Sequence, residues 1–391
     1  MATLTYRTAG ESHGPALISL IEGLPAGLPL DLELINNELK RRQGGYGRGG
    51  RQKLETDTVQ FLTGFRRGKA TGAPLTALVA NRDSRLDDTP ALYKPRPGHA
   101  DLAGAIKYLM SDCREILERA SARETANRVA VGAVAKCLLR LFGIEVVGFV
   151  TAIGTVAAEI PPDLPPAQLL ALRDASDTYC PDRTTTEAQI DLIRQMKSEG
   201  DTVGGIVESR VFGCPIGLGS MVHWDWKLDS RIAAEVMGVQ AIKGVEIGRG
   251  FESAQIVGSE LHDPIRYDAS KTQEANLGYV RDTNNAGGLE GGMTNGQTIV
   301  VRAAMKPIAT LLKKPMPSVH LETKAADKAD YERSDVCAVS ACSVIIEAVV
   351  AFEIARALRE KFGGDSLREM QANFNNFMQS ARHLSKDDLS K

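Results

Sequence analysis

The chain has 391 residues, of which 43 % are hydrophobic and 25 % charged, and its formal net charge is −2 at pH 7. This balance is typical of a globular protein that folds in water around a substantial apolar core. The near-neutral charge argues against a nucleic-acid-binding protein, which would carry a general excess of Lys and Arg. The length fits one large domain or several smaller ones, so it does not decide the number of domains.

Six cysteines are scattered along the chain without a Cys-x-x-Cys pair, and three of them lie in apolar, helix-like patterns: Cys113, Cys137 and Cys342. A disulfide framework is therefore not expected, and a reducing cytoplasm fits best. The first residues contain no apolar segment typical of a signal peptide. No uncharged apolar run reaches the roughly 18 residues that a membrane span needs. We expect a soluble cytoplasmic protein.

Short runs of β-branched and alternating apolar residues predict strands over 16–22, 75–80, 144–156, 203–212 and 296–304. Apolar residues spaced three and four apart predict helices. The first helix is expected from an Asp31 cap to about Arg42, and the second from about Arg123 to Phe142, with Gly143 as its stop. A third is expected from a Thr184–Glu187 capping box to Gly200, and a fourth from about Ser340 to Phe362.

Strands and helices do not alternate regularly, so the pattern gives little support to a Rossmann fold. The proline loop at 161–166 is the best candidate for a domain boundary, but a surface loop explains it equally well. Residues after 365 are polar, and we expect them to form a partly mobile tail.

Two segments place a histidine on a tight turn. In GESHG (10–14), glycines allow a close turn that leaves His13 accessible, and histidine can act as a general acid or base near neutral pH. In RPGHAD (96–101), a Pro-Gly turn presents His99 beside Arg96, and Asp101 could cap a following helix. Each segment alone could equally be a turn without a chemical role.

Two further segments are rich in glycine. KRRQGGYGRGGRQK (40–53) carries no acid, and its flexible backbone with Arg42, Arg48, Arg51 and Lys53 suits an anionic small molecule. A solvated basic loop is the alternative. NNAGGLEGGM (284–293) could hold a phosphate or lie against a flat ring, but it matches neither a P-loop nor a dinucleotide fingerprint.

Other catalytic signatures are missing from the sequence. The six histidines show no His-x-x-x-His or His-Glu-x-x-His spacing, so no metal site is expected, and no Gly-x-Ser-x-Gly hydrolase motif occurs. The residues by themselves therefore indicate an enzyme that acts on an anionic, phosphorylated small molecule with histidine acid–base groups.

Taken together, eight segments resemble the chorismate synthase family in their order and spacing, from about residue 6 to about residue 362. They are GESHG, RRQGGYGRGGR, RPGHAD, RASARET (119–125), IKGVEIG (242–248), NNAGGLEGG, MKP (305–307) and RSD (333–335). The resemblance implies a single large α+β domain over 1–364, a β-α-β layered sandwich, that assembles as a homotetramer. It also implies the elimination of phosphate from 5-enolpyruvylshikimate 3-phosphate to give chorismate, with reduced FMN required but not consumed.

The same resemblance implies roles for individual residues. The substrate's phosphate and carboxylates would be held by Ser12, Arg42, Arg48, Arg96 and Arg123. The flavin would lie against Arg119, Ala120, Ser121, Gln240, Ala241, Gly291, Lys306, Pro307, Ile308, Ala309, Thr310 and Arg333. His13 would protonate the leaving phosphate, His99 would set the protonation of the reduced flavin, and Asp335 would help flavin N5 accept the substrate's proton. A helix cap is a second possible role for Asp335.

The chain departs from the family pattern at two places. Ala120 and the run 306–310 (KPIAT) stand where some members carry additional hydroxyls, which matters only if side-chain oxygens bind the FMN phosphate. No dinucleotide fingerprint or added domain is evident, so NADPH would act only indirectly, through an external flavin reductase. The family also associates the positions of Arg42 and Arg48 with NADP, and that alternative stays open.

Two other classes of function compete with the lyase. A flavin oxidoreductase would consume one reduced cofactor for each substrate. A non-catalytic protein that binds anions or RNA through residues 40–53 would show steeply salt-dependent binding to polyanions.

Overall fold

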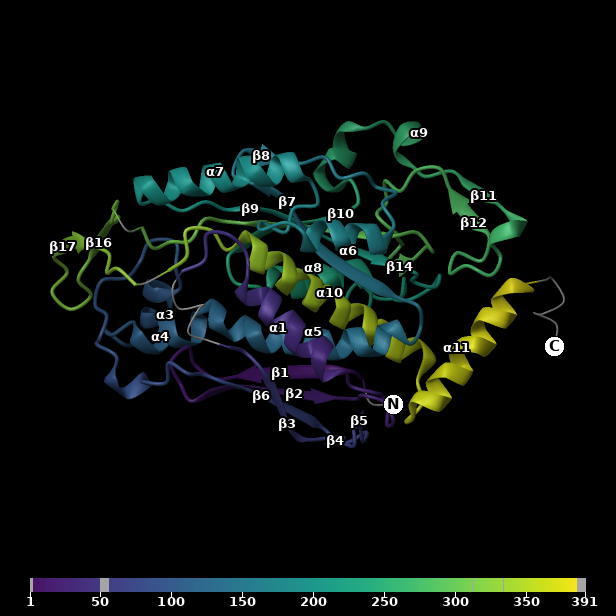
Figure 1. Cartoon of the computed structure of the whole chain (residues 1–391), viewed down its shortest axis with the longest axis horizontal. Helices are drawn as coiled ribbons and strands as arrows, with labels where there is room; N and C mark the ends of the chain where they lie inside the picture. Colours follow the sequence, from purple (N-terminus) through teal and green to yellow (C-terminus); the bar gives the residue numbers. More distant parts are fainter. Residues whose placement is uncertain (1–2, 50–55, 312, 333, 385–391) are drawn as a thin grey trace.

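Two antiparallel sheets enclose a layer of helices in the computed structural model (Figure 1). The structure describes residues 3–49, 56–311, 313–332 and 334–384. This layering of sheet, helices and sheet is the β-α-β sandwich that the family resemblance implies, so that expectation is confirmed.

The first sheet has the strand order β1-β2-β6-β3, with bounds Thr5–Ala9, Ala16–Glu22, Leu75–Ala80 and Val59–Thr63. The predictions for 16–22 and 75–80 are confirmed with the same boundaries. Side chains on β2 alternate, because successive residues of a strand face opposite sides. Leu17 and Ile21 are buried against the helices, whereas Ile18 and Leu20 remain 38 % and 36 % exposed on the other face.

The second sheet has the order β10-β15-β9-β7-β8, with bounds Ile242–Ile247, Ile299–Met305, Gly205–Phe212, Glu145–Ile153 and Val156–Ala157. The strands predicted over 144–156, 203–212 and 296–304 are all present in this sheet. The last begins three residues later than predicted, at Ile299, because the preceding residues form a turn in which the Gln297 amide donates to the Asn295 side chain.

The helical layer between the sheets contains α1 (Leu32–Gln43), α5 (Thr125–Arg140), α8 (Leu228–Met237) and α10 (Val339–Phe362). Nearly every residue of α10 is buried, as expected for a helix covered on all sides. The predicted cap of α1 is confirmed, since Asp31 accepts hydrogen bonds from the amides of Glu33 and Leu34.

A buried carboxylate joins several of these elements. Glu347 of α10 accepts from Arg41 of α1 at 3.0 Å and from the Gly148 amide at 2.8 Å, and it also pairs with Lys136 and Arg173. Burial by itself would raise the pKa of Glu347, but the three cations lower it. The carboxylate therefore stays ionised and joins α1, α5 and α10 to the helix that carries Arg173.

The outer face of the second sheet is covered by α6 (Pro166–Asp174), whose Leu169 packs on Val147 and Phe149 of β7. Next comes α7 (Arg183–Glu199), which ends at Gly200 as predicted, with φ of +68°. The predicted Thr184–Glu187 capping box is wrong. Asp182 caps the helix instead, because its carboxylate accepts from the Thr185 amide.

The segment after residue 365 is not simply a polar tail. It begins with α11 (Leu367–Arg382), which starts with a capping box between Ser366 and Glu369 and buries Met370 and Met378. Shorter elements complete the fold: α3 (Asp101–Tyr108), α4 (Arg114–Ala120), α9 (Gly258–Leu261), β4 (Phe65–Arg66), β5 (Lys69–Ala70), β11 (Ile265–Tyr267), β12 (Tyr279–Arg281), β13 (Leu289–Glu290), β14 (Met293–Thr294), β16 (Pro317–Val319) and β17 (Ala326–Lys328).

All six cysteines are buried and unbridged. In the part of the chain that the structure describes, no helix combines the length and apolar character that a membrane span requires.

The crossing of α5 and α10 depends on Gly132, because a Cβ at this position would lie 2.4 Å from the Cα atom of Ala348. Alanine is the better helix former by about 1 kcal/mol. We nevertheless expect Gly132→Ala to lower the free energy of unfolding by about 1–3 kcal/mol, since it overpacks a buried contact. Chemical denaturation measures this change. Gly258→Ala is the control, since its nearest neighbour would be an ordinary 3.8 Å away. Equal stability of the Gly132 variant and the unmodified protein would contradict the prediction.

Candidate active site

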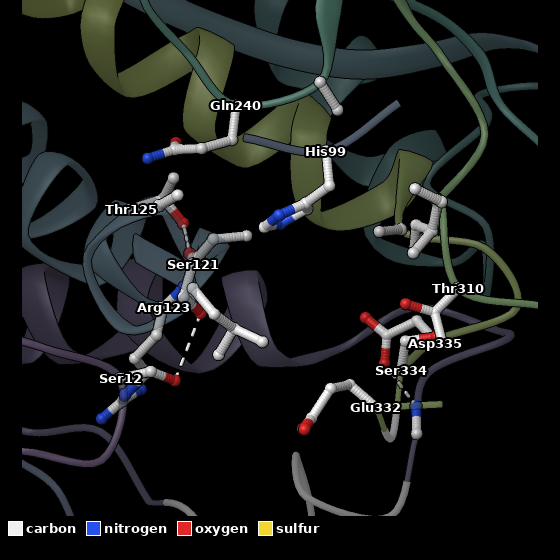
Figure 2. A pocket seen from close by; sticks show the side chains of 18 of the residues that line it. Ser12, His99, Ser121, Arg123, Thr125, Gln240, Thr310, Glu332, Ser334 and Asp335 are labelled. Carbon is white, nitrogen blue, oxygen red and sulfur yellow. Dashed lines mark hydrogen bonds between the residues drawn. The ribbon is translucent and has the colours of Figure 1, made fainter. Parts of the chain in front are cut away.

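One cavity of about 810 Å³ lies at the end of the helical layer and is lined by segments from Ser12 to Ile345. Its size is typical of a site for small organic molecules. Figure 2 shows Ser12, Ser121 and Arg123 on one side of the cavity and Thr310 and Asp335 on the other, with His99 between them.

The turn between β1 and β2 carries His13 into this cavity. Gly10 has φ of +110°, and a Cβ there would lie 2.5 Å from the carbonyl oxygen of Ala16, so only glycine fits. The turn is fastened to α4: the Ser12 amide donates to the Glu118 carbonyl at 3.0 Å, and the His13 amide donates to the Glu118 carboxylate at 2.8 Å. The ring nitrogen Nδ1 of His13 lies 2.8 Å from the same carboxylate.

Arg42 and Arg123 share one buried carboxylate. Asp57 Oδ2 lies 2.7 Å from Arg123 Nη1 and 3.5 Å from Arg42 Nη1. Arg42 also donates to the Thr125 hydroxyl and to a backbone carbonyl, and Arg123 donates to Asn81. Burial lowers the pKa of Arg42 to about 9 although Asp57 opposes that effect, so the guanidinium is still charged at neutral pH.

The other two arginines each have a carboxylate of their own. Arg48 lies 2.7 Å from Asp335, which also accepts from the Gly49 amide at 2.6 Å. Asp335 is therefore not a helix cap. That alternative is wrong, because α10 begins later, after Ala338, and has no side-chain cap.

Arg96 donates through Nε to Asp101 at 2.8 Å. Asp101 also lies 2.5 Å from Nδ1 of His99, and it is the first residue of α3 rather than its cap, so the expected capping role is wrong. Burial by itself would raise the pKa of Asp101, but His99 and Arg96 lower it.

Four buried guanidinium groups meet at this cavity. Among the described residues their carboxylate partners are Asp57, Asp335 and Asp101, and the arginine side chains are no more than 10 % exposed. Water screens such buried charges poorly, so an anionic ligand would be strongly favoured. All five residues that sequence reasoning assigned to the substrate line this one cavity: Ser12, Arg42, Arg48, Arg96 and Arg123.

Most of the residues expected to hold a flavin line the same cavity: Ala120, Ser121, Gln240, Ala241, Lys306, Pro307, Ile308, Ala309 and Thr310. Gln240 donates to Glu124 at 3.1 Å, while its buried Oε1 has no partner among the described residues. The side chain of Lys306 donates to the carbonyl of Gly98, which holds the two sides of the cavity together.

Two expected flavin residues do not line the cavity. Arg119 is directed to the backbone of β1, where it donates to the carbonyls of Thr8 and Gly10 at 3.0 Å. Gly291 lies in the turn between β13 and β14. Three further predicted positions, Arg51, Lys53 and Arg333, lie outside the described residues.

Three of the acids that hold the cationic groups were not predicted from the sequence: Asp57, Glu118 and Asp83. Asp57 is one of the first acids after the basic segment, so its position offered a signal. Glu118 offered none, because a glutamate in a polar stretch of α4 is ordinary for a helix surface. Asp83, whose Oδ2 lies 3.6 Å from Nε2 of His13, also stands in no recognisable motif.

Comparison with known proteins agrees with this architecture. A family model described as chorismate synthase matches residues 4–358. Chorismate synthase of Desulforamulus reducens is 53 % identical over 97 % of this chain and 100 % of its own length. That of Geobacter sulfurreducens is 52 % identical over 97 % and 99 %.

A crystal structure of a chorismate synthase superposes with a TM-score of 0.79 at 40 % identity, and the match covers 97 % of this chain and 98 % of that one. The family match therefore extends over both sheets, the helices between them and the cavity. The chain belongs to the chorismate synthase family, the carbon–oxygen lyases (EC 4.2.3.5) of the shikimate pathway.

Proposed function

We propose that this cavity converts 5-enolpyruvylshikimate 3-phosphate to chorismate and phosphate by 1,4-elimination, with reduced FMN bound beside the substrate. The observation that carries the proposal is the gathering of four buried arginines and two histidines around one cavity. A substrate with one phosphate and two carboxylates matches this cationic lining, and paired guanidinium hydrogen bonds would fix its orientation.

Another part of the cavity lining suits a flat ring. Ala120, Ala241 and Ala309 present small side chains, and Gln240 offers an unpartnered acceptor for a ring N–H group. Reduced flavin bound here would supply an electron-rich ring that stabilises the electron deficit of the substrate. The small side chains and the unpartnered acceptor of Gln240 fit such a ring.

The side chains of this chain handle the protons. His13 donates a proton from Nε2 to the departing phosphate, and the arginines stabilise the developing negative charge. His99 holds a proton near the flavin position, supported by Asp101. Asp335 lies across the cavity and assists the removal of the substrate's proton. Burial of these groups excludes water, which would otherwise compete for the protons.

The reduced flavin is supplied from outside. NADPH would serve only indirectly, through a separate cytoplasmic flavin reductase, because the sequence contains no dinucleotide fingerprint. Arg42 and Arg48 line the same cavity as Arg96 and Arg123, which supports a role in substrate binding for these residues.

An anaerobic assay with 5-enolpyruvylshikimate 3-phosphate and a trace of reduced FMN tests the reaction. We expect many phosphates released per flavin, with the reduced flavin spectrum restored at the end, because no electrons are consumed. Phosphate release and flavin absorbance are followed together. One turnover per flavin would instead identify an oxidoreductase, and no turnover would identify a binding protein.

Two histidine variants test the proton transfers. His13→Ala and His99→Ala should each lower kcat by about 10²-fold or more, the usual effect of losing a proton-transfer group. His262→Ala is the control, since this histidine is absent from the cavity lining. Near-normal kcat in both cavity variants would remove these histidines from the mechanism.

We also propose that the chain forms the homotetramer typical of its family, with the open face of the first sheet as one contact. Ile18 and Leu20 of β2 and Leu62 of β3 are 36–50 % exposed there, and Figure 1 shows no helix over this face. Exposed apolar side chains on a sheet that lacks a covering layer are typical of an interface.

Light scattering should therefore give four chain masses for the unmodified protein, and the double variant Leu20→Lys/Leu62→Lys should give a smaller assembly, because buried lysines would repel one another. Leu172→Lys on α6 is the control. A monomeric unmodified protein would contradict the proposal, and so would a double variant of full size.

A further inference from the structure

The carboxylate of Glu118 contacts both the backbone amide and the ring of His13. Its carboxylate oxygens lie 2.8 and 3.0 Å from Nδ1 of His13, and one of them accepts from the His13 amide at 2.8 Å. The Glu118 side chain has no exposed surface. It cannot touch a ligand in the cavity, and it does not line the cavity.

The ionisation of Glu118 determines which ring nitrogen of His13 carries a hydrogen. Burial by itself would raise the pKa of Glu118, but the hydrogen bonds from His13 and the charge of Arg114 lower it. An ionised carboxylate can only accept hydrogen bonds. Nδ1 must therefore carry a hydrogen, and Nε2 is left as the atom of the ring that can exchange a proton with a ligand.

The opposite side of the ring faces the cavity. Nε2 lies 3.6 Å from Asp83, which is paired with Arg85, and both of these residues line the cavity. The other charged groups are Arg114, which lies 3.6 Å from Glu118, and the residues that line the rest of the cavity: Arg42, Arg48, Arg96, His99, Arg123, Lys306, Glu332 and Asp335.

We propose that Glu118 is a positioning residue that holds His13 with Nδ1 protonated and stabilises the imidazolium, so that Nε2 can deliver its proton to the leaving phosphate. The inference rests on the proposed role of His13 as the proton donor. The proton moves from Nε2 to the phosphate oxygen as the carbon–oxygen bond breaks and its electron pair leaves with the phosphate.

A comparison with the second histidine supports a distinct role for Glu118. Asp101, the partner of His99, is held at 2.8 Å by Arg96, so its charge is largely neutralised by that guanidinium. The cation nearest to Glu118 is Arg114, at 3.6 Å, and Arg114 also pairs with Glu332 at 3.0 Å. More of the negative charge of Glu118 is therefore available to the imidazolium of His13.

The test is the pH profile of kcat for Glu118→Gln, measured anaerobically with reduced FMN and 5-enolpyruvylshikimate 3-phosphate. Glutamine keeps the shape and one acceptor but removes the charge. The imidazolium is the active form of the acid, so activity is lost as pH rises and the ring deprotonates. Without the carboxylate the ring deprotonates at lower pH, and the alkaline limb should move down by about one pH unit or more.

We also expect kcat at neutral pH to fall about tenfold or more, with KM for the substrate changed less than about threefold because Glu118 does not line the cavity. The matched control is Glu208→Gln, a buried carboxylate paired with Arg210 at 2.7 Å on β9 and outside the cavity lining. Its kcat and pH profile should equal those of the unmodified enzyme.

Each outcome decides the proposal. A lower kcat with an unmoved alkaline limb would show a merely structural role for Glu118 and overturn it, and so would an unchanged kcat. If Glu118→Gln does not fold, Glu118→Asp keeps the charge and should retain the limb while kcat falls. A limb that moves in this variant overturns the proposal. Normal turnover of His13→Ala would instead refute the proposed role of His13 itself.

Discussion

The burial of four guanidinium groups beside one another is the constraint on which this site depends. Like charges in a poorly hydrated cavity repel, and each loses hydration that the protein must replace. Among the described residues the chain does so with three carboxylates, of which Asp57 serves both Arg42 and Arg123. The guanidinium groups that line the cavity would form charge-assisted hydrogen bonds to an anionic ligand. Neighbouring arginines are used differently, since Arg41 pairs with Glu347 in the core while Arg42 lines the cavity.

Local sequence was sufficient for most of the regular structure. The strand over 16–22 follows from the alternation of buried and exposed side chains. The start of the first helix follows from the Asp31 side-chain oxygen, which accepts from backbone amides, and the end at Gly200 follows from a glycine in the left-handed conformation. Each of these signals acts within a few residues. The prediction of a Thr184–Glu187 capping box is wrong because Asp182, two residues earlier, accepts the hydrogen bond from the Thr185 amide and caps the helix. The helix after residue 365 was missed because its apolar residues are few and its burial depends on tertiary packing against α10, which the local pattern does not record.

Only part of the candidate site could be predicted from the sequence. Residues that line the cavity lie in glycine-rich turns with unusual composition, so Arg48, His13 and His99 could be predicted. Residues that hold them come from ordinary segments, and their partners are distant in the sequence: Glu118 lies 105 positions from His13. No periodicity or spacing records such a pairing. Asp335 was noticed, but its bond to Arg48 and the Gly49 amide appears only when the chain is folded.

The wide spread of the cavity lining along the chain has a consequence for biosynthesis. Its contributors run from Ser12 to Ile345, so a growing polypeptide holds the arginines long before α10 exists to complete the wall. A translation product that ends before residue 335 would lack the carboxylate partner of Arg48. The wall of the cavity is complete only once the chain has been synthesised through Ile345.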